Sequence, residues 1–286
     1  MAIQDPLGDR MKALERATAG AAIPATSAIY VRLDGRGFSR FTRDMARPFD
    51  ARMTAAMRAT AEHLLTALHP RAAYVQSDEV SLLWAPAIKE DGTPGEHVFG
   101  GKPMKITSVL AGLATAAFTR AVLDDSAGLS AWAERLPHFD ARVVEMADTR
   151  DAVAAFAWRG QDARRNGIRQ LASAHFSHRT LQQTGNREVV GMLADMGLHL
   201  ADQPAAALNG TLLRRVPVTR PLTDDERLRI PPAHRPGPGT QVTRTDVAAF
   251  DDAHPGRISN LDAVLLSGAD PQVASRAKPV ADRAGA

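Results

Sequence analysis

The chain has 286 residues, 44% of them hydrophobic, and its 35 Lys and Arg residues outnumber 32 Asp and Glu residues to give a net charge of +3. This apolar fraction supports an ordinary core, which excludes a chain that is disordered throughout. Because cysteine is absent, disulfides, thiolate zinc sites and cysteine nucleophiles are excluded, and any metal must bind oxygen or imidazole. We therefore expect a protein of the reducing cytoplasm.

The N-terminus lacks the basic-then-apolar pattern of a signal peptide, and no stretch approaches the roughly 20 uninterrupted apolar residues of a membrane span. We therefore expect a soluble protein without a membrane partner. Arginine supplies 30 of the 35 cations, which explains a sequence pI near 9.6. The mild basic excess is compatible with nucleic-acid binding, and the codon composition of the source genome explains the excess of Arg over Lys equally well.

Hydrophobic periodicity predicts six elements in the first half of the chain. Asp34-Gly35-Arg36-Gly37 ends the first strand, Asp50 caps the first helix, and Ser77-Asp78-Glu79 joins the second and third strands. In chain order, the predictions are a strand at 28–33, a helix at 50–69, strands at 72–76 and 80–84, a helix at 105–123 and a strand at 139–146.

This β-α-β-β-α-β order is the split βαβ, or ferredoxin-like, arrangement, which is also the core of polymerase palm domains. A right-handed crossover makes the first two strands parallel, and the third strand inserts antiparallel between them. The end of the first strand and the turn between the second and third strands therefore lie on the same edge of the sheet. We expect Asp34 and Asp78 to meet there.

The remaining chain predicts an α+β protein with additional helices: a helix at 148–173, a shorter helix at 188–196 and a strand at 210–216. Six prolines follow between Pro217 and Gly239, and the composition beyond them is polar apart from a small apolar cluster at 261–266. We interpret 1–147 as a palm domain, 148–220 as a helical, RNA-contacting extension packed on it, and 221–286 as a Pro-rich, weakly ordered tail.

Two carboxylates at one sheet edge, beside a Gly-rich turn, are suited to two Mg²⁺ ions and a triphosphate. Mg²⁺ prefers hard oxygen ligands and commonly takes one or two carboxylates plus phosphate oxygens. Gly35 and Gly37 allow the backbone to approach the phosphates closely. Taken alone, each motif is an ordinary turn. Together on the split βαβ, they predict a nucleotidyl-transfer site.

These motifs also carry a resemblance to a known family. Arg32 to Phe38, Arg47-Pro48-Phe49-Asp50 and Gln76 to Glu79 occur in the order and spacing typical of tRNA-histidine guanylyltransferase-like proteins, which add nucleotides to the 5′ end of RNA in the 3′-to-5′ direction. Further matches are Lys105 to Ser108, Phe139 to Arg142 and Trp158-Arg159. The resemblance extends over roughly residues 10–216.

The resemblance implies specific roles. Asp34, Asp78 and the Gly35 carbonyl would bind metal, and Glu79 would support catalysis. The nucleotide would contact Asp34, Gly35, Arg36, Gly37, Phe38, Ser39, Arg47, Ser77, Asp78 and Lys105. RNA would contact Arg159, Arg164, Arg165, Asn166 and Arg169, although a solvated helix face is a nearly equal alternative for these arginines. Trp84, Trp132 and Trp158 are expected to pack rather than to stack on bases.

The chain departs from the family pattern at three places. Arg47 stands where a Lys is usual, and Ser39 replaces a common His. The eukaryotic enzymes carry a His-Ile-Asn-Asn run where this chain reads Arg164-Arg165-Asn166-Gly167. That departure, with Phe176 to Arg179, resembles the bacterial and archaeal branch, whose members prefer template-dependent repair of 5′-truncated tRNA.

The resemblance therefore implies a Mg²⁺-dependent nucleotidyltransferase that uses ATP and GTP or other nucleoside triphosphates on tRNA, and that assembles as a homotetramer. One alternative is the addition of a single guanylate to histidine tRNA. Others are a non-catalytic RNA-binding palm protein, which would gain little from carboxylates near phosphate, and a nucleotide cyclase, for which the arginines at 164–169 have no obvious purpose.

Overall fold

The computed structural model describes residues 20–274 except 125 and 127, together with residues 7, 10, 11, 13 and 14. Its centre is one six-stranded sheet with the strand order β4-β1-β3-β2-β5-β6, and every neighbouring pair is antiparallel. The strands are β1 (Ala28–Arg36), β2 (Ala72–Gln76), β3 (Glu79–Trp84), β4 (His138–Met146), β5 (Thr211–Pro221) and β6 (Gln241–Phe250).

The first four strands form the predicted split βαβ core. Strand β3 lies antiparallel between β1 and β2, so β1 and β2 run in the same direction. The predicted α+β, ferredoxin-like fold is thus confirmed. One boundary was wrong: β1 continues through Gly35 to Arg36 because β4 pairs with it as far as His138. Asp34 is therefore a strand residue rather than part of a terminating turn.

Helices α3 (Ala51–Leu68) and α4 (Pro103–Leu123) cover one face of the sheet and enclose the first core. The Asp50 carboxylate caps α3 by accepting a 2.9 Å hydrogen bond from the Arg52 amide, as predicted. By length and composition alone, α4 could cross a membrane, because it contains a window of mean hydropathy 1.6. Its residues Leu110 and Phe118 lie in the first core, and the core helix of a globular protein meets the same criterion.

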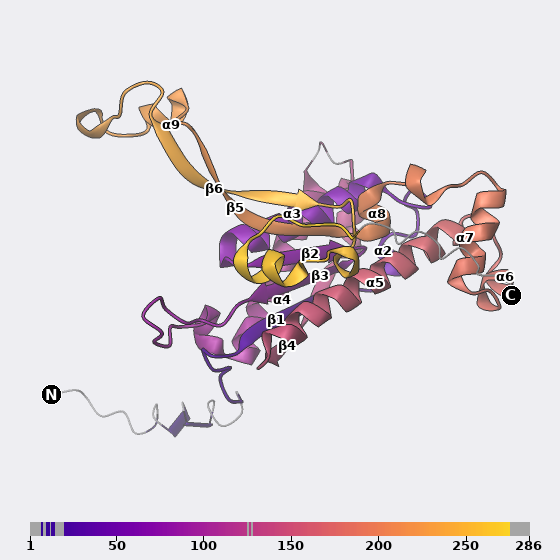
Figure 1. The fold of residues 1–286 in the computed structure, drawn as a ribbon, viewed down its shortest axis with the longest axis horizontal. Helices are drawn as coiled ribbons and strands as arrows, with labels where there is room; N and C mark the ends of the chain where they lie inside the picture. Colours follow the sequence, from indigo (N-terminus) through magenta and orange to yellow (C-terminus); the bar gives the residue numbers. More distant parts are fainter. Residues whose placement is uncertain are drawn as a thin grey trace, which may run out of the picture.

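Helix α5 (Thr149–Ser173) lies across the opposite face of the sheet (Figure 1). Even-numbered β1 residues point toward this helix: the Tyr30 ring meets the Phe156 ring edge-on, with centroids 6.0 Å apart. Both rings belong to a second core cluster that the tail completes through Leu261 and Leu265. Since strand side chains alternate between faces, the side chain of Asp34 also lies on the α5 face.

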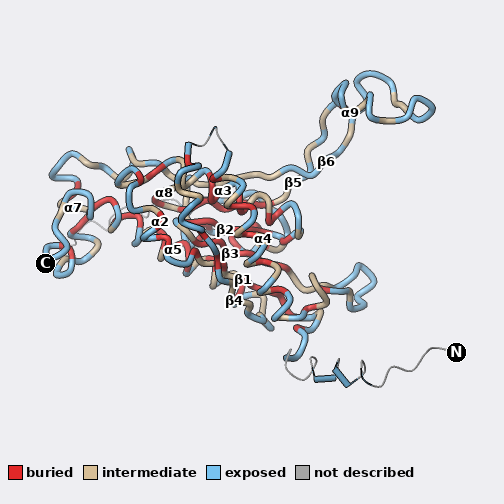
Figure 2. The backbone as a smooth tube through the Cα atoms, turned by 180° about the vertical axis from the view of Figure 1, so that it is seen from behind, coloured by how far each residue is buried: buried red, intermediate tan, exposed pale blue. Residues whose placement is uncertain are grey.

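The predicted weak order of 221–286 is wrong for its described part. Strand β6 pairs with β5 over ten register positions, from Leu212–Phe250 to Pro221–Gln241. The apolar cluster at 261–266 contributes Val264 and Leu265 to the second core, which explains why this polar segment is ordered. The outer β5–β6 hairpin and α9 (Asp224–Leu228) project from the body and are mostly exposed (Figure 2). Residues 275–286 lie outside the described part.

Beyond the sheet, α5 continues into a third apolar cluster with α6 (His178–Gln182) and α7 (Asn186–Asp195). Helix α8 (Ala205–Asn209) leads into β5 and packs closely against α5. A Cβ atom on Gly167 would lie 2.9 Å from the Ala207 carbonyl oxygen, so glycine permits this approach. The helical extension is therefore packed on the palm, whereas the boundaries near 147 and 220 stay predictions.

Candidate active site

The sheet brings Asp34 and Asp78 to one edge. Asp34 on β1 is the register partner of Glu79 on β3, and Asp78 immediately precedes Glu79 in the two-residue β2–β3 turn. The Gly35 amide donates a 2.9 Å hydrogen bond to the Asp78 carbonyl oxygen, which ties the turn to β1. In the same turn, Ser77 adopts a left-handed backbone conformation with φ 48°. The predicted juxtaposition of the two aspartates is confirmed.

Asp78 is held in an environment that disfavours its charge. Burial has the largest influence and raises the pKa of its carboxyl, and the nearby Asp34 carboxylate raises it further; hydrogen bonds from its own backbone and from Ser77 act in the opposite direction. Neither aspartate forms an ion pair with any described residue. Two close carboxylates without a countercharge are therefore suited to bind a cation.

Mg²⁺ fits this donor set. Both side chains supply hard oxygen atoms, and such sites are usually completed by water and phosphate oxygens rather than by a full protein cage. A full protein cage is not seen here, since the described residues contain no cluster of three or more His, Asp or Glu side chains arranged to hold a metal. Asp34 and Asp78 would hold the metal, and the substrate would supply further oxygen ligands.

Glu79 has a different environment from its two neighbours. It is 5% exposed, and both of its carboxylate oxygens accept 2.7 Å hydrogen bonds from the Arg159 guanidinium on α5. Arg159 also lies 3.1 Å from Asp162. Burial raises the pKa of Glu79, while Arg159 and Arg32 lower it. Glu79 therefore joins α5 to the carboxylate edge, and its predicted catalytic support would be exerted through this connection.

The Arg159 contacts contradict a predicted RNA contact. Its side chain is 8% exposed, and its guanidinium is occupied by two carboxylates. Arg169 is also engaged, because it donates to the Asn186 side chain at 2.7 Å and to the carbonyl oxygens of Leu181 in α6 and Thr184 after it, and its RNA contact stays a prediction. Long side chains on one helix reach partners that periodicity does not reveal.

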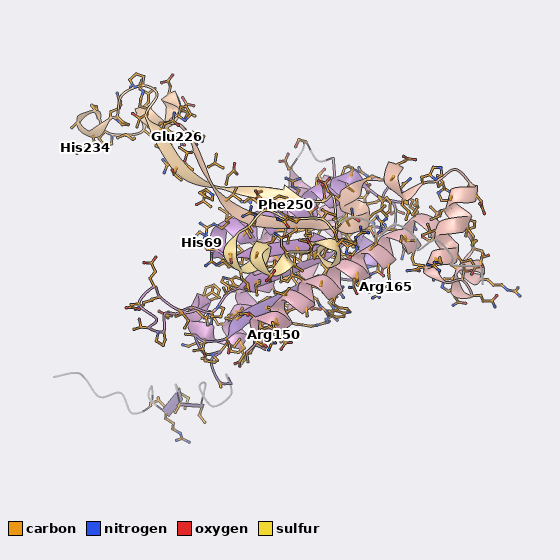
Figure 3. All side chains as sticks on the ribbon, in the orientation of Figure 1. His69, Arg150, Arg165, Glu226, His234 and Phe250 are labelled. Carbon is orange, nitrogen blue, oxygen red and sulfur yellow. The ribbon has the colours of Figure 1, made fainter. Side chains whose placement is uncertain are left out.

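The other three predicted RNA residues have mixed environments. Arg165 is exposed on α5 and pairs with Asp162 at 2.8 Å (Figure 3). Asn166 is exposed and lines the cleft at the carboxylate edge. Arg164 is half-buried and donates a 3.2 Å hydrogen bond to the Asn209 side chain. RNA contact stays a prediction for these three residues.

A cleft of about 440 Å³ opens beside the carboxylates, between α3, the segment following β1, and α5. Arg47 is exposed at its wall and its side chain forms no ion pair or hydrogen bond with another described residue, so its charge is available for an anion. The predicted nucleotide residues that line the cleft are Asp34, Phe38, Ser39, Arg47, Ser77 and Asp78.

Gly35 is required by close packing at this site. A Cβ atom added to it would lie 2.5 Å from the ring of Phe38, which is buried among Phe41, Phe118 and Phe139 with ring centroids 5.2 Å away in each case. Gly37 has φ 70° and open space around it, so its requirement is conformational. Phe38 thus anchors the loop beneath the cleft from the hydrophobic core.

Four predicted nucleotide residues do not line the cleft: Gly35, Gly37, Arg36 and Lys105. Arg36 is exposed at the end of β1, opposite His138 on β4. Lys105 lies in the first turn of α4, whose preceding segment packs at the start of β1 through a hydrogen bond from Ile23 to Gly101. Thr115, ten residues further along α4, accepts a hydrogen bond from Phe139 near the carboxylate end. Lys105 is therefore about 15 Å back along the helix axis from the carboxylate end, and its nucleotide contact stays a prediction.

The cleft also includes residues that the motif analysis did not assign to it. Gln76 is buried at the end of β2, Thr211 at the start of β5, and Asp50 at the start of α3. Asp50 was expected only as a helix cap. Gln76 belongs to a motif of the family resemblance that implies no role for it, whereas no sequence signal marks Thr211, because β5 enters the site only through its pairing with β2.

This geometry defines a class of protein: a palm-type nucleotidyltransferase with a pair of unpartnered carboxylates at the sheet edge. The family model described as tRNAHis guanylyltransferase matches residues 8–147. Together with the 28% identical solved structure described below, this match supports membership of the chain in the tRNA-histidine guanylyltransferase-like family.

Solved structures of this family have the same fold. A bacterial tRNA(His) guanylyltransferase-like protein in complex with ATP is 28% identical, with a TM-score of 0.65 over 73% of this chain and 88% of that chain. A structure of such a bacterial protein in complex with GTP is 24% identical, with a TM-score of 0.65 over 87% and 93% of the two chains, and supports the fold.

Relatives outside the bacteria extend the similarity. The tRNA(His) guanylyltransferase of Saccharomyces cerevisiae has a TM-score of 0.57 at 19% identity, covering 70% of this chain and 91% of that chain, so it is similar in fold. An uncharacterized protein of Acanthamoeba polyphaga mimivirus is 27% identical over 210 residues, which are 68% of this chain and 71% of that protein.

Proposed function

We propose that the protein repairs 5′-truncated tRNA by adding nucleotides in the 3′-to-5′ direction, in a Mg²⁺-dependent reaction dictated by the opposing template base. Family membership supports the coarser activity, nucleotidyl transfer at the 5′ end of tRNA. The observation that carries the proposal is the pair of unpartnered carboxylates, Asp34 and Asp78, beside a cleft with an available arginine, Arg47.

The proposed reaction has two in-line displacements at phosphorus. In the first, an oxygen of the tRNA 5′-monophosphate attacks the α-phosphorus of ATP, and pyrophosphate leaves. In the second, the 3′-hydroxyl of an incoming nucleoside triphosphate attacks the activated 5′-phosphorus, and AMP leaves. If the tRNA end already carries a triphosphate, the same attack expels pyrophosphate. Each step exchanges one phosphorus–oxygen bond for another, and the attacking hydroxyl loses its proton to solvent.

The chain supplies binding and orientation for these steps. Bound Mg²⁺ would lower the pKa of the attacking hydroxyl and stabilise charge on the leaving oxygen. Asp34 and Asp78 would hold the metal, and the Arg47 fork would bind the triphosphate in the cleft together with the exposed Ser39 and Ser77 hydroxyls. The Arg159–Glu79 pair would keep α5 at a constant position relative to the carboxylates.

One alternative keeps support of its own: addition of a single guanylate to histidine tRNA, which is the activity that the family model's description names. Against it, Arg164-Arg165-Asn166-Gly167 stands where the eukaryotic enzymes carry His-Ile-Asn-Asn. We also propose assembly as a homotetramer, by resemblance to the family, and a cytoplasmic location, from the absence of cysteine.

The decisive experiment uses two 5′-labelled substrates: a tRNA truncated by one nucleotide and a histidine tRNA that lacks its extra guanylate. Each is incubated with Mg²⁺, ATP and one nucleoside triphosphate at a time. Extension dictated by the opposing base supports repair, whereas guanylate added only to histidine tRNA supports the alternative. Asp78→Ala should abolish extension, and Asp195→Asn, an exposed aspartate on α7, is the matched control. RNA binding without extension under any condition would contradict both activities.

A further inference from the structure

A second cavity lies on the α5 face of the sheet, on the opposite side of α5 from the cleft. It has a volume of about 520 Å³ and is bounded by β1 and the edge strand β4 on one side and by the first half of α5 on the other. We call this cavity the β4 groove. Its lining residues are Tyr30, Arg32, Arg142, Val144, Met146, Asp151, Ala154, Ala155 and Trp158.

The β4 groove exposes a tryptophan. Trp158 is 50% exposed and so lies outside the core, and the expectation that it packs rather than stacks on a base stays untested. Trp84, in contrast, is 7% exposed and donates to the Leu68 carbonyl, and Trp132 packs against the first core. The Arg159 guanidinium lies 4.6 Å from the Trp158 ring centroid. An aromatic ring that is backed by an arginine and half open to solvent is a suitable surface for stacking a nucleobase.

Two arginines mark the end of the groove nearest the active site. Arg32 on β1 and Arg142 on β4 are register partners, and Asp34 lies two residues beyond Arg32 on the same face, about 7 Å along the strand. The Arg32 Nε atom is 3.8 Å from Glu79 and, although buried, has no hydrogen-bond partner. Arg142 is 56% exposed, with only a 3.9 Å contact to Asp140. Both cations therefore retain capacity for an anion.

The rest of the groove is largely apolar. Val144 and Met146 on β4 face Ala154 and Ala155 on α5, and Asp151 lies at the far end, seven residues before Trp158. The groove thus gathers Arg32, Arg142 and Trp158 at the end nearest the carboxylates, since Trp158 lies against Arg159, the partner of Glu79, and presents an apolar surface further away. Two cations and a stacking surface at this end suit a nucleotide whose phosphate is at the reacting end.

We propose that the β4 groove binds the 5′-terminal nucleotide of the RNA substrate, with its 5′-phosphate at Arg32 and Arg142 and its base on Trp158. The orientation favours this occupant over an incoming nucleoside triphosphate, because the incoming nucleotide must present its 3′-hydroxyl, not a phosphate, to the carboxylates. The two reactants then approach Asp34 from opposite sides of α5, the RNA end from the β4 groove and the triphosphate from the cleft. This inference rests on the proposed function.

The test is direct binding without turnover. The full-length protein is titrated, in the absence of nucleotides, with a 3′-labelled acceptor-stem RNA that carries a 5′-monophosphate, and anisotropy gives the affinity. Trp158→Ala and Arg142→Ala should each weaken binding about tenfold, whereas Trp158→Phe should retain most of the affinity. Arg58→Ala is the matched control, because Arg58 is 47% exposed on α3, at the other face of the sheet. Thermal melts verify that each variant is folded.

Intrinsic fluorescence and the RNA end identify the occupant. The 5′-phosphorylated RNA should quench the emission component that Trp158→Phe removes, and RNA with a 5′-hydroxyl should bind more weakly and lose its sensitivity to Arg142→Ala. The inference is overturned if Trp158→Ala and wild type bind the RNA equally, or if ATP quenches Trp158 and the RNA does not. These binding experiments measure no turnover, so their outcomes can be told apart from failure of the proposed function. In that case, the wild-type protein would bind RNA through the groove but would not extend it.

Discussion

The three carboxylates of the β1–β3 edge occupy two contrasting environments within a few residues of each other. Asp34 and Asp78 have no cation among the described residues, whereas Glu79 is clamped by Arg159 with two hydrogen bonds of 2.7 Å. Burial raises the pKa of both Asp78 and Glu79. The protein neutralises one carboxylate internally, which fixes α5 on the sheet, whereas the other two have no internal countercharge and are suited to an external cation.

The largest expected effect comes from removing an unpaired carboxylate. Asp78→Asn should reduce nucleotidyl transfer more than about a thousandfold, since a metal ligand is lost. Because the folded-state pKa of Asp78 is raised, its ionised form opposes folding at neutral pH, and its stabilising contribution is present only at low pH. The melting temperature of the metal-free variant at pH 7 should therefore equal or exceed that of wild type. A lower melting temperature would contradict the unpaired state of Asp78.

Breaking the ion pair between Glu79 and Arg159 should, in contrast, lower the stability of the fold. Arg159→Ala leaves Glu79 buried without its cation, and we expect a loss of about 3–5 kcal/mol in the free energy of unfolding, measured with urea. Adding Glu79→Gln should recover part of this loss, because the uncompensated charge is then gone. A double-mutant cycle measures the coupling. Strictly additive losses would show that the two side chains act independently.

Substitution of Gly35, the residue after Asp34, should have an intermediate effect on the free energy of unfolding. Gly35→Ala places a Cβ atom 2.5 Å from the buried Phe38 ring, and overpacking of this kind costs about 1–3 kcal/mol. Gly37→Ala meets no atom but must adopt φ 70°, which should cost about 1 kcal/mol. Urea unfolding of both variants gives the comparison. A smaller loss for Gly35→Ala than for Gly37→Ala would contradict the packing requirement.

Asp50 provides a paired carboxylate with the opposite pKa shift from Asp78. Hydrogen bonds from Arg52, above all, hold the pKa of Asp50 well below its ordinary value of 3.8. A depressed pKa gives stability that is present above the ordinary pKa and lost as pH falls toward the folded-state pKa. Asp50→Ala should cost about 1–2 kcal/mol at pH 7, and this difference should narrow below about pH 4. Melting curves from pH 7 to 3 test this; a difference independent of pH would refute the ionic contribution.

The smallest effect separates two arginines of α5. Arg165→Ala should leave the melting temperature unchanged and, if Arg165 contacts phosphate, reduce the slope of log affinity against log salt by about 1. Arg169→Ala should instead lower stability by about 1–3 kcal/mol, because it unties the α6–α7 connection. RNA titrations at several salt concentrations and thermal melts distinguish them. A stability loss at Arg165 alone would reverse these assignments.

Local sequence patterns predicted the palm core because each strand and helix has its own periodicity and cap. Asp50 caps α3 as expected, and Asp148, for which no cap was predicted, caps α5. The β5–β6 pairing was missed because the prolines of this region indicated a linker. Pro217 and Pro221 nevertheless lie in strand β5, and β6 pairs with β5 along one side. At the site, the motif spacing identified the cleft residues from Asp34 to Asp78, but it could not separate a free arginine such as Arg47 from a committed one such as Arg159.

The sequence by itself therefore determined the ferredoxin-like order and the meeting of Asp34 with Asp78, since helix and strand periodicity and crossover handedness are set by local chemistry and chirality. Only the tertiary structure decided that Glu79 belongs to Arg159, that Lys105 lies far from the cleft and that Trp158 faces the β4 groove. These outcomes depend on how α4 and α5 lie against the sheet, and a long side chain finds its partner only after that packing exists.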